Sequence, residues 1–315
     1  MCISYRLQRI IRRASERSDR LQLTLMGSWT KEEFLGKRSY GTVRRAVPLT
    51  GELADSPLMM VSEIAVKSAL FKSTTSIYLQ KEGEILFLLS DSPGIIRCYG
   101  EDISHQESKC VYNLLLEFAP NGSLKSLIER RGGAQPESEV RCYTRMILKA
   151  LNCVHERGYV HCDIKPDNIL VFPSQDGNRN YVKIADFGLA KKADEGNGRI
   201  NVQGRVRGTV PYASPESIVW NMNKSPVDIW ALGCTVSQMM TGRGEDFLRI
   251  ELPRIPENMS SQGKDFLRKC FESEWETRST AAELLRHPFV QGEPEKWANE
   301  MPLDARWVSR VSMFK

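Results

Sequence analysis

Two short stretches of the chain hold side chains of the types that phosphoryl transfer requires. Residues 161–168 read HCDIKPDN, and residues 184–188 read IADFG. An aspartate can accept the proton of a substrate hydroxyl, a lysine can neutralise a phosphate as it moves, and an asparagine with a second aspartate can hold two magnesium ions. The candidates for these roles are Asp163, Lys165, Asn168 and Asp186.

Phosphate groups also need a place to bind, and an earlier motif fits that need. Residues 35–43 read LGKRSYGTV, a pattern typical of a glycine-rich loop, in which the missing Cβ of Gly36 and Gly41 lets the backbone approach phosphate oxygens. Arg38 stands where the middle glycine of that pattern is expected, and an ordinary β-turn is the plain alternative. The loop is therefore weak evidence when it is taken alone.

A lysine and a glutamate follow at a spacing that allows an ion pair. Lys67 lies in a β-rich run that starts at Ile64, and Glu82 lies in the next stretch of helical periodicity. Each has a plain alternative, namely a solvated lysine at a strand edge and a glutamate on a helix surface, and Glu84 is a second candidate for the helix position. Because the ordered set of motifs as a whole is hard to obtain by chance, we expect Lys67 to hold phosphates and Glu82 to orient it.

Composition limits the class of protein. The chain has 315 residues with 41% hydrophobic side chains, enough for a sizeable core divided between two domains or lobes. A net charge of +5 is mild and gives no sign of a nucleic-acid partner. The eight cysteines are scattered without a C-x-x-C pair, which favours reduced thiols over disulfides or a metal site. No apolar run is long enough for a transmembrane segment, and no secretory signal is apparent.

Periodicity predicts a strand-rich first part and a helical second part. Residues 29–115 are expected to form strands around one helix at 74–89, with a long loop at 47–62. From residue 120 onward helices dominate, and residues 140–154 carry a clear apolar stripe. This order indicates the α+β class.

Turn and capping residues add detail to the second part. Asp176-Gly177 predicts a hairpin between residues 169–172 and 181–184. Ser225 is expected to cap a buried helix whose first residue is Pro226, and Gly242 is expected to end it.

The two ends of the chain differ from the rest. Residues 1–28 combine apolar residues at helical spacing with arginines, a pattern typical of a basic amphipathic helix. Such a helix can contact a membrane surface, bind a partner or act as a transit peptide, and a disordered tail is the alternative. We expect either that residues 1–25 are dispensable or that Met26 is an alternative start, and we expect residues 291–315 to form a tail.

The motifs and their order resemble those of the eukaryotic protein kinases over roughly residues 30–290. Residues 208–216 read GTVPYASPE and are similar to the family's peptide-binding segment, while residues 228–233 are similar to the central helix of its large lobe. Lys165 together with Thr209 is the pattern of serine/threonine kinases. The resemblance implies a bilobal α+β protein-kinase fold, with a small β-rich N-lobe and a larger helical C-lobe. The implied bounds are 29–290 for the kinase domain, 29–117 for the N-lobe and 120–290 for the C-lobe.

The same resemblance implies ATP and Mg²⁺ as cofactors and assigns roles to individual residues. Asp163, Lys165, Lys67 and Glu82 are the implied catalytic residues, and Asn168 and Asp186 the implied metal ligands. The residues implied to bind the nucleotide are Gly36, Gly41, Val43, Ala65, Lys67, Glu117, Ala119 and Leu170, with Leu116 as gatekeeper. The implied substrate segment comprises Thr209 and Glu216, with Arg278 as the buried partner of Glu216.

Within that family, residues 118–124 and 143–148 look most like plant mitogen-activated protein kinase kinase kinases. That resemblance implies a protein substrate, a MAP kinase kinase, and a cytoplasmic protein, with the nucleus left open as a second compartment. Two alternatives remain: a pseudokinase scaffold that binds nucleotide or partner kinases without efficient phosphoryl transfer, and a small-molecule kinase that shares the core. Filled catalytic positions argue against the first alternative, and the peptide-binding segment argues against the second.

The chain departs from the family pattern at several positions. Cys162 stands where an arginine usually anchors a phosphate on the activation loop, and residues 189–208 contain no Ser, Thr or Tyr. We therefore expect activity that does not require phosphorylation of that loop. Arg38 adds bulk to the glycine-rich loop, and the segment between Gly242 and Pro256 is short in a region that often docks substrates.

Overall fold

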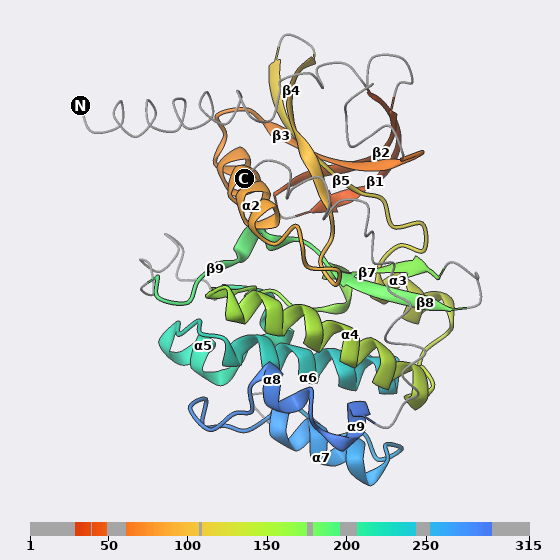
Figure 1. Ribbon diagram of the computed structural model, residues 1–315, viewed down its shortest axis with the longest axis vertical. Helices are drawn as coiled ribbons and strands as arrows, with labels where there is room; N and C mark the ends of the chain where they lie inside the picture. Colours follow the sequence, from red (N-terminus) through yellow and green to blue (C-terminus); the bar gives the residue numbers. More distant parts are fainter. Residues whose placement is uncertain are drawn as a thin grey trace. The chain divides into compact units, whose positions relative to one another are not determined.

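The computed structural model describes residues 29–38, 40–48, 61–106, 109–174, 179–195, 207–243 and 253–291. The chain divides into two compact units, Met1–Gly83 with Arg97–Phe118, and Glu84–Ile96 with Ala119–Lys315. The first unit is rich in strands and the second in helices, which confirms the predicted α+β class (Figure 1).

The first unit is built on an antiparallel sheet of five strands in the order β1-β2-β3-β5-β4. The strands are β1 Trp29–Arg38, β2 Gly41–Pro48, β3 Ile64–Leu70, β4 Cys98–Gln106 and β5 Lys109–Glu117. Ile64 and Val66 are fully buried in an apolar cluster with Leu115. Because side chains alternate along a strand, Ala65 and Lys67 point to the opposite face of β3.

Helix α2, Thr74–Leu88, carries Glu82 toward that opposite face of the sheet. Ser73 begins the helix, since its hydroxyl accepts a hydrogen bond from the backbone N–H of Ser76 at 3.1 Å. Gly83 allows the close approach, because a Cβ there would lie 2.9 Å from Cδ1 of Leu114 on β5. The predicted helix at 74–89 is confirmed to within one residue at its end.

The second unit packs helices around α4, Glu137–Glu156, and α6, Pro226–Thr241, which lie side by side in Figure 1. The apolar stripe predicted over 140–154 is buried along α4, and nearly every residue of α6 is buried. The other helices are α3 Leu124–Arg130, α5 Pro215–Trp220, α7 Ser261–Cys270, α8 Ala281–Leu284 and α9 Pro288–Gln291.

Short strands and single helical turns complete the second unit. Strand β6, Tyr159–Val160, pairs with β9, Lys191–Lys192, and β7, Ile169–Pro173, pairs with β8, Asn180–Ile184. The pairing of β7 with β8 confirms the predicted hairpin, although its turn at 176–177 lies outside the described residues. The single 3₁₀ turns are η2 Pro166–Asn168, η3 Phe187–Leu189 and η4 Val210–Tyr212.

The ends of α6 test the capping prediction. Gly242 ends the helix with φ +70°, and its N–H donates to the carbonyl of Gln238 at 2.8 Å, as predicted. The predicted start is confirmed in position, since α6 begins at Pro226 directly after Ser225, but Ser225 has helical dihedrals and its side chain makes no capping hydrogen bond. A helical turn begins earlier, since the N–H of Val227 donates to the carbonyl of Lys224 at 3.0 Å.

Several predictions concern residues outside the described ranges. They are the amphipathic pattern of residues 1–28, most of the loop at 47–62, and the tail at 291–315, of which only residue 291 is described. Among the helices in the described part of the chain, none is long and apolar enough to cross a membrane.

Candidate active site

In the first unit, the predicted ion pair between Lys67 and Glu82 is present. Nζ of Lys67 lies 2.7 Å from Oε2 of Glu82, and the two side chains are 3% and 1% exposed. A buried ammonium needs such a partner because desolvation otherwise disfavours its charge. The pair therefore keeps a positive charge in place at the middle of β3.

The residues expected around the nucleotide in this unit lie on neighbouring strands. Val43 on β2 is opposite Lys67 on β3, and Ala65 on β3 is opposite Leu116 on β5. Glu117 ends β5, and its carboxylate accepts a hydrogen bond from the N–H of Arg97 at 3.1 Å.

The two glycines of the predicted phosphate loop differ in what surrounds them. Gly41 has φ +143°, and a Cβ there would collide with the carbonyl oxygen of Ser68, so only glycine fits. Gly36 has φ +156°, which also favours glycine, although nothing lies near its missing Cβ. The side chain of Arg38 is outside the described part of the structure.

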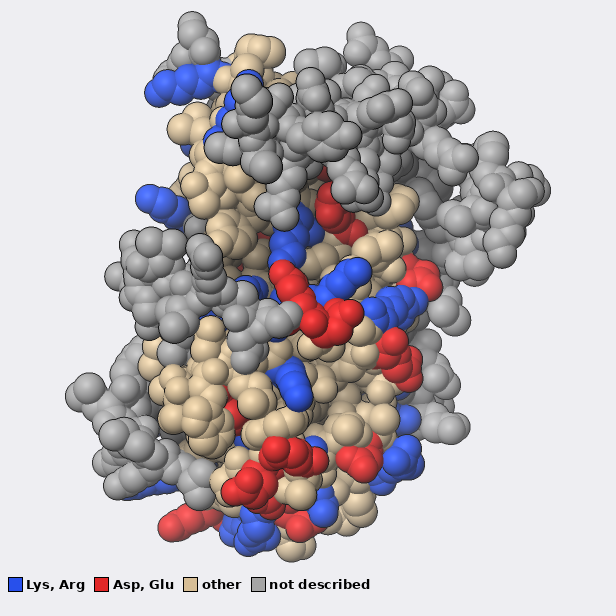
Figure 2. All heavy atoms as spheres, turned by 90° about the vertical axis from the view of Figure 1, so that its left-hand side faces the viewer, with Lys and Arg blue, Asp and Glu red and all other residues tan. Residues whose placement is uncertain are grey.

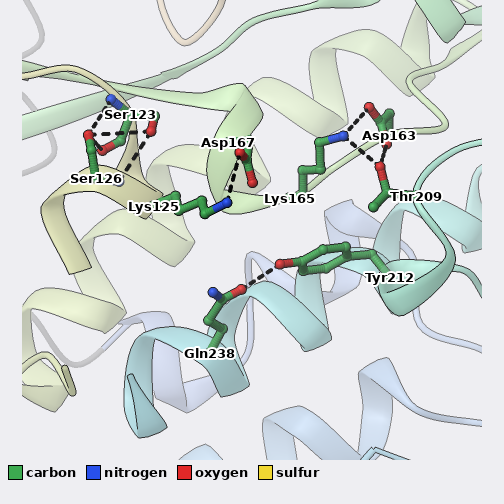
Figure 3. Close-up of polar contacts among 9 residues, drawn as sticks. All are labelled: Ser123, Lys125, Ser126, Asp163, Lys165, Asp167, Thr209, Tyr212 and Gln238. Carbon is green, nitrogen blue, oxygen red and sulfur yellow. Dashed lines mark hydrogen bonds and ion pairs between the residues drawn. The ribbon is translucent and has the colours of Figure 1, made fainter. Parts of the chain in front are cut away.

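In the second unit, Asp163, Lys165 and Thr209 point toward one another (Figure 3). Nζ of Lys165 donates to Oδ2 of Asp163 at 2.8 Å and to Oγ1 of Thr209 at 2.5 Å. The hydroxyl of Thr209 in turn donates to Oδ1 of Asp163 at 2.7 Å. A carboxylate, an ammonium and a hydroxyl thus meet at one point, where a substrate hydroxyl can be deprotonated beside a positive charge.

The two predicted metal ligands lie on either side of the β7–β8 hairpin. Nδ2 of Asn168 donates to the backbone carbonyl and to Oδ2 of Asp163, both at 2.9 Å, which leaves the amide oxygen to act as a ligand. Asp186 adopts φ +63° at the start of η3, and the preceding Ala185 donates its N–H to the carbonyl of Asn168 at 2.9 Å. An amide oxygen and a carboxylate are donors that a hard divalent cation prefers, so the residues fit such an ion.

Asp228, a fully buried residue of α6, fixes the backbone of the catalytic loop, residues 161–168. Its carboxylate accepts hydrogen bonds from the backbone N–H groups of His161 and Cys162, both at 2.8 Å, and lies 2.9 Å from Nε2 of His155. These bonds hold Cys162 at φ +67°, a conformation that a non-glycine residue rarely adopts. Sequence reasoning placed Asp228 in a central helix but assigned it no role at the site.

His161 is a second residue whose role sequence reasoning missed. Its Nδ1 accepts the N–H of Asp163 at 3.2 Å, so its Nε2, 3.1 Å from the carbonyl of Ala185, carries the proton. Its ring also packs edge-on against Phe187, with 4.6 Å between ring centroids. The imidazole therefore joins the loop of Asp163 to the segment of Asp186. The signal available in the sequence was a histidine two residues before the catalytic aspartate.

The side chain of Cys162, at the position where the family usually has an arginine, is buried in a small apolar cluster. Its thiol packs with Val160 and Val227, and Leu189 covers the cluster. Burial raises the pKa of the Cys162 thiol well above its usual value, so the group stays neutral. The position therefore carries no charge with which to bind a phosphate.

The predicted partners Glu216 and Arg278 form a buried bidentate ion pair. Nη1 and Nη2 of Arg278 lie 2.6 and 3.1 Å from the two carboxylate oxygens of Glu216. The same guanidinium donates to the carbonyls of Pro226 and Glu272 and lies over the ring of Trp230. All three nitrogens of the guanidinium thereby donate hydrogen bonds, which anchors the end of the substrate segment.

Two further contacts fix the start and middle of that segment. Gly208 has φ +108°, and a Cβ there would lie 2.5 Å from the carbonyl oxygen of Cys162. The hydroxyl of Tyr212 donates to Oε1 of Gln238 on α6 at 2.6 Å (Figure 3). Thr209, between them, is held against the catalytic loop.

Comparison with known proteins identifies the family. The protein kinase domain matches residues 29–290. The chain belongs to the protein kinase family. The domain and the relatives of the chain make it a Ser/Thr protein kinase, which is a transferase. The family uses ATP together with a divalent metal ion.

Several similar proteins of Arabidopsis thaliana are named as mitogen-activated protein kinase kinase kinases. The chain is 41% identical to mitogen-activated protein kinase kinase kinase 20 of Arabidopsis thaliana, over 83% of this chain and 78% of the relative. It is 38% identical to mitogen-activated protein kinase kinase kinase 18 of the same plant, over 85% and 79% of the two chains. Mitogen-activated protein kinase kinase kinase 2 is 36% identical over 86% of this chain, which spans only 42% of that longer relative. The plant MAP kinase kinase kinase resemblance seen in the sequence is thus confirmed.

Proposed function

We propose that this kinase phosphorylates serine or threonine residues of a MAP kinase kinase, with Mg²⁺ as its metal ion. The names of its plant relatives support the substrate class. The observation that carries the catalytic part is the contact of Asp163, Lys165 and Thr209, since it places a base, a cation and the substrate segment together.

The roles of the individual side chains follow from their positions. Asp163 accepts the proton of the substrate hydroxyl as its oxygen bonds to the γ-phosphorus of ATP and the bond to ADP breaks. Lys165 neutralises negative charge on the transferred group, and it also holds Asp163 in position through its 2.8 Å contact. In the first unit, Lys67 binds nucleotide phosphates while Glu82 keeps it oriented.

The metal ion would be held by the amide oxygen of Asn168 and the carboxylate of Asp186. When bound, it supplies positive charge to the phosphates of the nucleotide. The hydrogen bonds of Asn168 to Asp163 occupy its amide nitrogen, so the amide oxygen would be the ligand.

A kinase assay on a panel of proteins tests the proposal. The panel contains kinase-inactive MAP kinase kinases, a generic serine- and threonine-rich protein, and small alcohols and aminoglycosides. We expect incorporation of radiolabelled phosphate into serine or threonine of a MAP kinase kinase, dependent on Mg²⁺ and lost in Asp186→Asn. Robust transfer by Asp186→Asn contradicts the metal assignment, and phosphorylation of other proteins alone contradicts the substrate class.

The location of the kinase is also a proposal. Cytoplasmic residence, and contact of residues 1–25 with a membrane surface or a partner, are tested by fractionation of the full chain and of a chain that starts at Met26.

A further inference from the structure

The last turn of α5 exposes three consecutive apolar side chains. Glu216 and Ser217 in its first half are buried, whereas Ile218, Val219 and Trp220 are 49%, 67% and 63% exposed. We define these three residues as the α5 patch. A run of large apolar side chains in water is unfavourable, and such runs on a folded surface mark sites of interaction. Tryptophan in particular often supplies the main anchor of a protein interface.

The α5 patch continues the segment that receives the substrate. Thr209, which contacts the catalytic aspartate, and Trp220 belong to one short stretch of chain, and Val210 between them is 54% exposed. The stretch is rigid at both ends, because Thr209 is bonded to the catalytic loop and Glu216 to Arg278. The patch therefore belongs to the same short segment as Thr209, which contacts Asp163.

An acidic loop borders the α5 patch. Residues 272–276 read ESEWE, and Glu272, Glu274 and Glu276 are exposed. None of these three carboxylates forms an ion pair with any residue in the described part of the chain. The loop is fastened to α5 by Arg278, which bonds both Glu216 and the carbonyl of Glu272.

One cation lies at the edge of this surface. The ammonium of Lys224, just after α5, is 4.4 Å from the ring of Trp275 in the acidic loop. The three glutamates of the acidic loop outnumber the single ammonium of Lys224, so these four residues carry a net negative charge at neutral pH. Figure 2 views this side of the helical unit and shows several acidic side chains, with Lys and Arg among them, below an area with few charged groups.

We infer that the α5 patch is a docking site for the protein substrate, and that it binds a substrate segment with apolar side chains next to Lys or Arg. The inference rests on the proposed function of the site and adds a second contact outside the phosphorylated sequence. Apolar burial supplies the affinity, whereas the acidic border attracts the basic side chains and fixes their placement. Two features favour the protein substrate as the partner that binds the α5 patch. The patch continues the substrate segment, and the acidic loop beside the patch is negatively charged.

Kinetics on a protein and on a short peptide separate docking from catalysis. The protein is a kinase-inactive MAP kinase kinase that the enzyme phosphorylates, and the peptide contains only the phosphorylated site. Trp220→Ser and Val219→Ser are expected to raise the KM for the protein about tenfold and to leave kcat and the KM for the peptide unchanged. Ile77→Ser is the matched control for Val219→Ser, because Ile77 on α2 is 62% exposed against 67% for Val219.

Removal of the border charges tests the second half of the inference. Changing Glu272, Glu274 and Glu276 together to glutamine should raise the KM for the protein and weaken its dependence on salt. The KM for the peptide should again stay the same. An unchanged KM and salt dependence would show that the bound segment is not basic and would overturn that part of the inference.

Other outcomes overturn the docking site itself. An unchanged KM for the protein in Trp220→Ser excludes substrate docking, and an equal rise for the peptide shows that α5 acts only through the substrate segment. If the KM for the protein is unchanged but Trp220→Ser abolishes self-association in sedimentation, the occupant is a second copy of the chain. If the KM is unchanged but Trp220→Ser abolishes binding of a synthetic peptide of residues 1–25, the occupant is that segment. If the enzyme phosphorylates another protein of the panel and no MAP kinase kinase, the proposed function fails, and the same variants measured on that protein still test the docking site.

Discussion

Replacing Asp228 by asparagine should loosen the catalytic loop without touching any group that reacts. The Asp228 carboxylate accepts two backbone N–H groups, those of His161 and Cys162, and contacts His155. Asparagine has one acceptor oxygen and an NH₂ group that can only donate. One of the two N–H groups therefore loses its acceptor while it stays buried.

The cost follows from the hydrogen bonds involved. An orphaned buried donor costs about 1–3 kcal/mol, and the remaining bonds lose the roughly twofold strengthening that a charged acceptor provides. We therefore expect the free energy of unfolding to fall by about 2–4 kcal/mol, which corresponds to a decrease in Tm of roughly 5–15 °C. Cys162, held at φ +67°, is then free to relax, and Asp163 moves with it. A displacement of about 1 Å at the base lowers kcat by about 10–100-fold.

The assay combines thermal unfolding, followed by circular dichroism, with steady-state kinetics below the Tm. Asp265→Asn is the matched control, because the Asp265 carboxylate also lies 2.9 Å from a histidine Nε2, that of His287, but its side chain is 53% exposed. The control should change the Tm by no more than a degree or two and leave kcat unchanged. An Asp228→Asn protein with the Tm and kcat of the wild type would refute the conclusion that this carboxylate holds the loop.

Four further predictions concern regulation, the nucleotide and stability. Phosphatase treatment should leave activity unchanged, because Cys162 cannot bind a phosphate; loss of activity on dephosphorylation within residues 186–216, checked by mass spectrometry, would contradict this. Arg38→Gly should lower the KM for ATP, since glycine lets the loop lie closer to phosphates, whereas a higher KM would show that the arginine contacts a phosphate. Arg278→Lys should lower the free energy of unfolding by about 2–4 kcal/mol in denaturant titrations, because an ammonium cannot replace the bidentate contact. Arg131→Lys, at a partly exposed arginine paired with Glu139, is the control. Iodoacetamide at neutral pH should label the exposed Cys110 and spare Cys162, whose raised pKa keeps the reactive thiolate absent; rapid labelling of Cys162 in the folded protein would be inconsistent with its burial.

Much of the candidate site was predictable because its groups are close in sequence. Asp163, Lys165 and Asn168 lie within one loop, and their types and spacing indicated their chemistry before any fold was known. The pair of Lys67 and Glu82 was predictable because one strand leads directly to one helix. At Ser225, local propensity predicted the position of the helix start but wrongly implied a capping hydrogen bond, because the turn before α6 starts one residue earlier and gives Ser225 helical dihedrals.

The sequence by itself determined the order of elements, the phosphoryl-transfer chemistry and the absence of a cation at Cys162. These properties depend on residue type, on periodicity and on short spacings, which are local. Only the tertiary structure decided that Asp228 holds the backbone of His161 and Cys162, across 67 and 66 positions, and that the acidic loop borders the α5 patch. Such contacts form because a buried carboxylate must find donors and a buried guanidinium must find acceptors. The packing of the helices decides which distant groups supply these donors and acceptors, and a local sequence pattern does not contain that information.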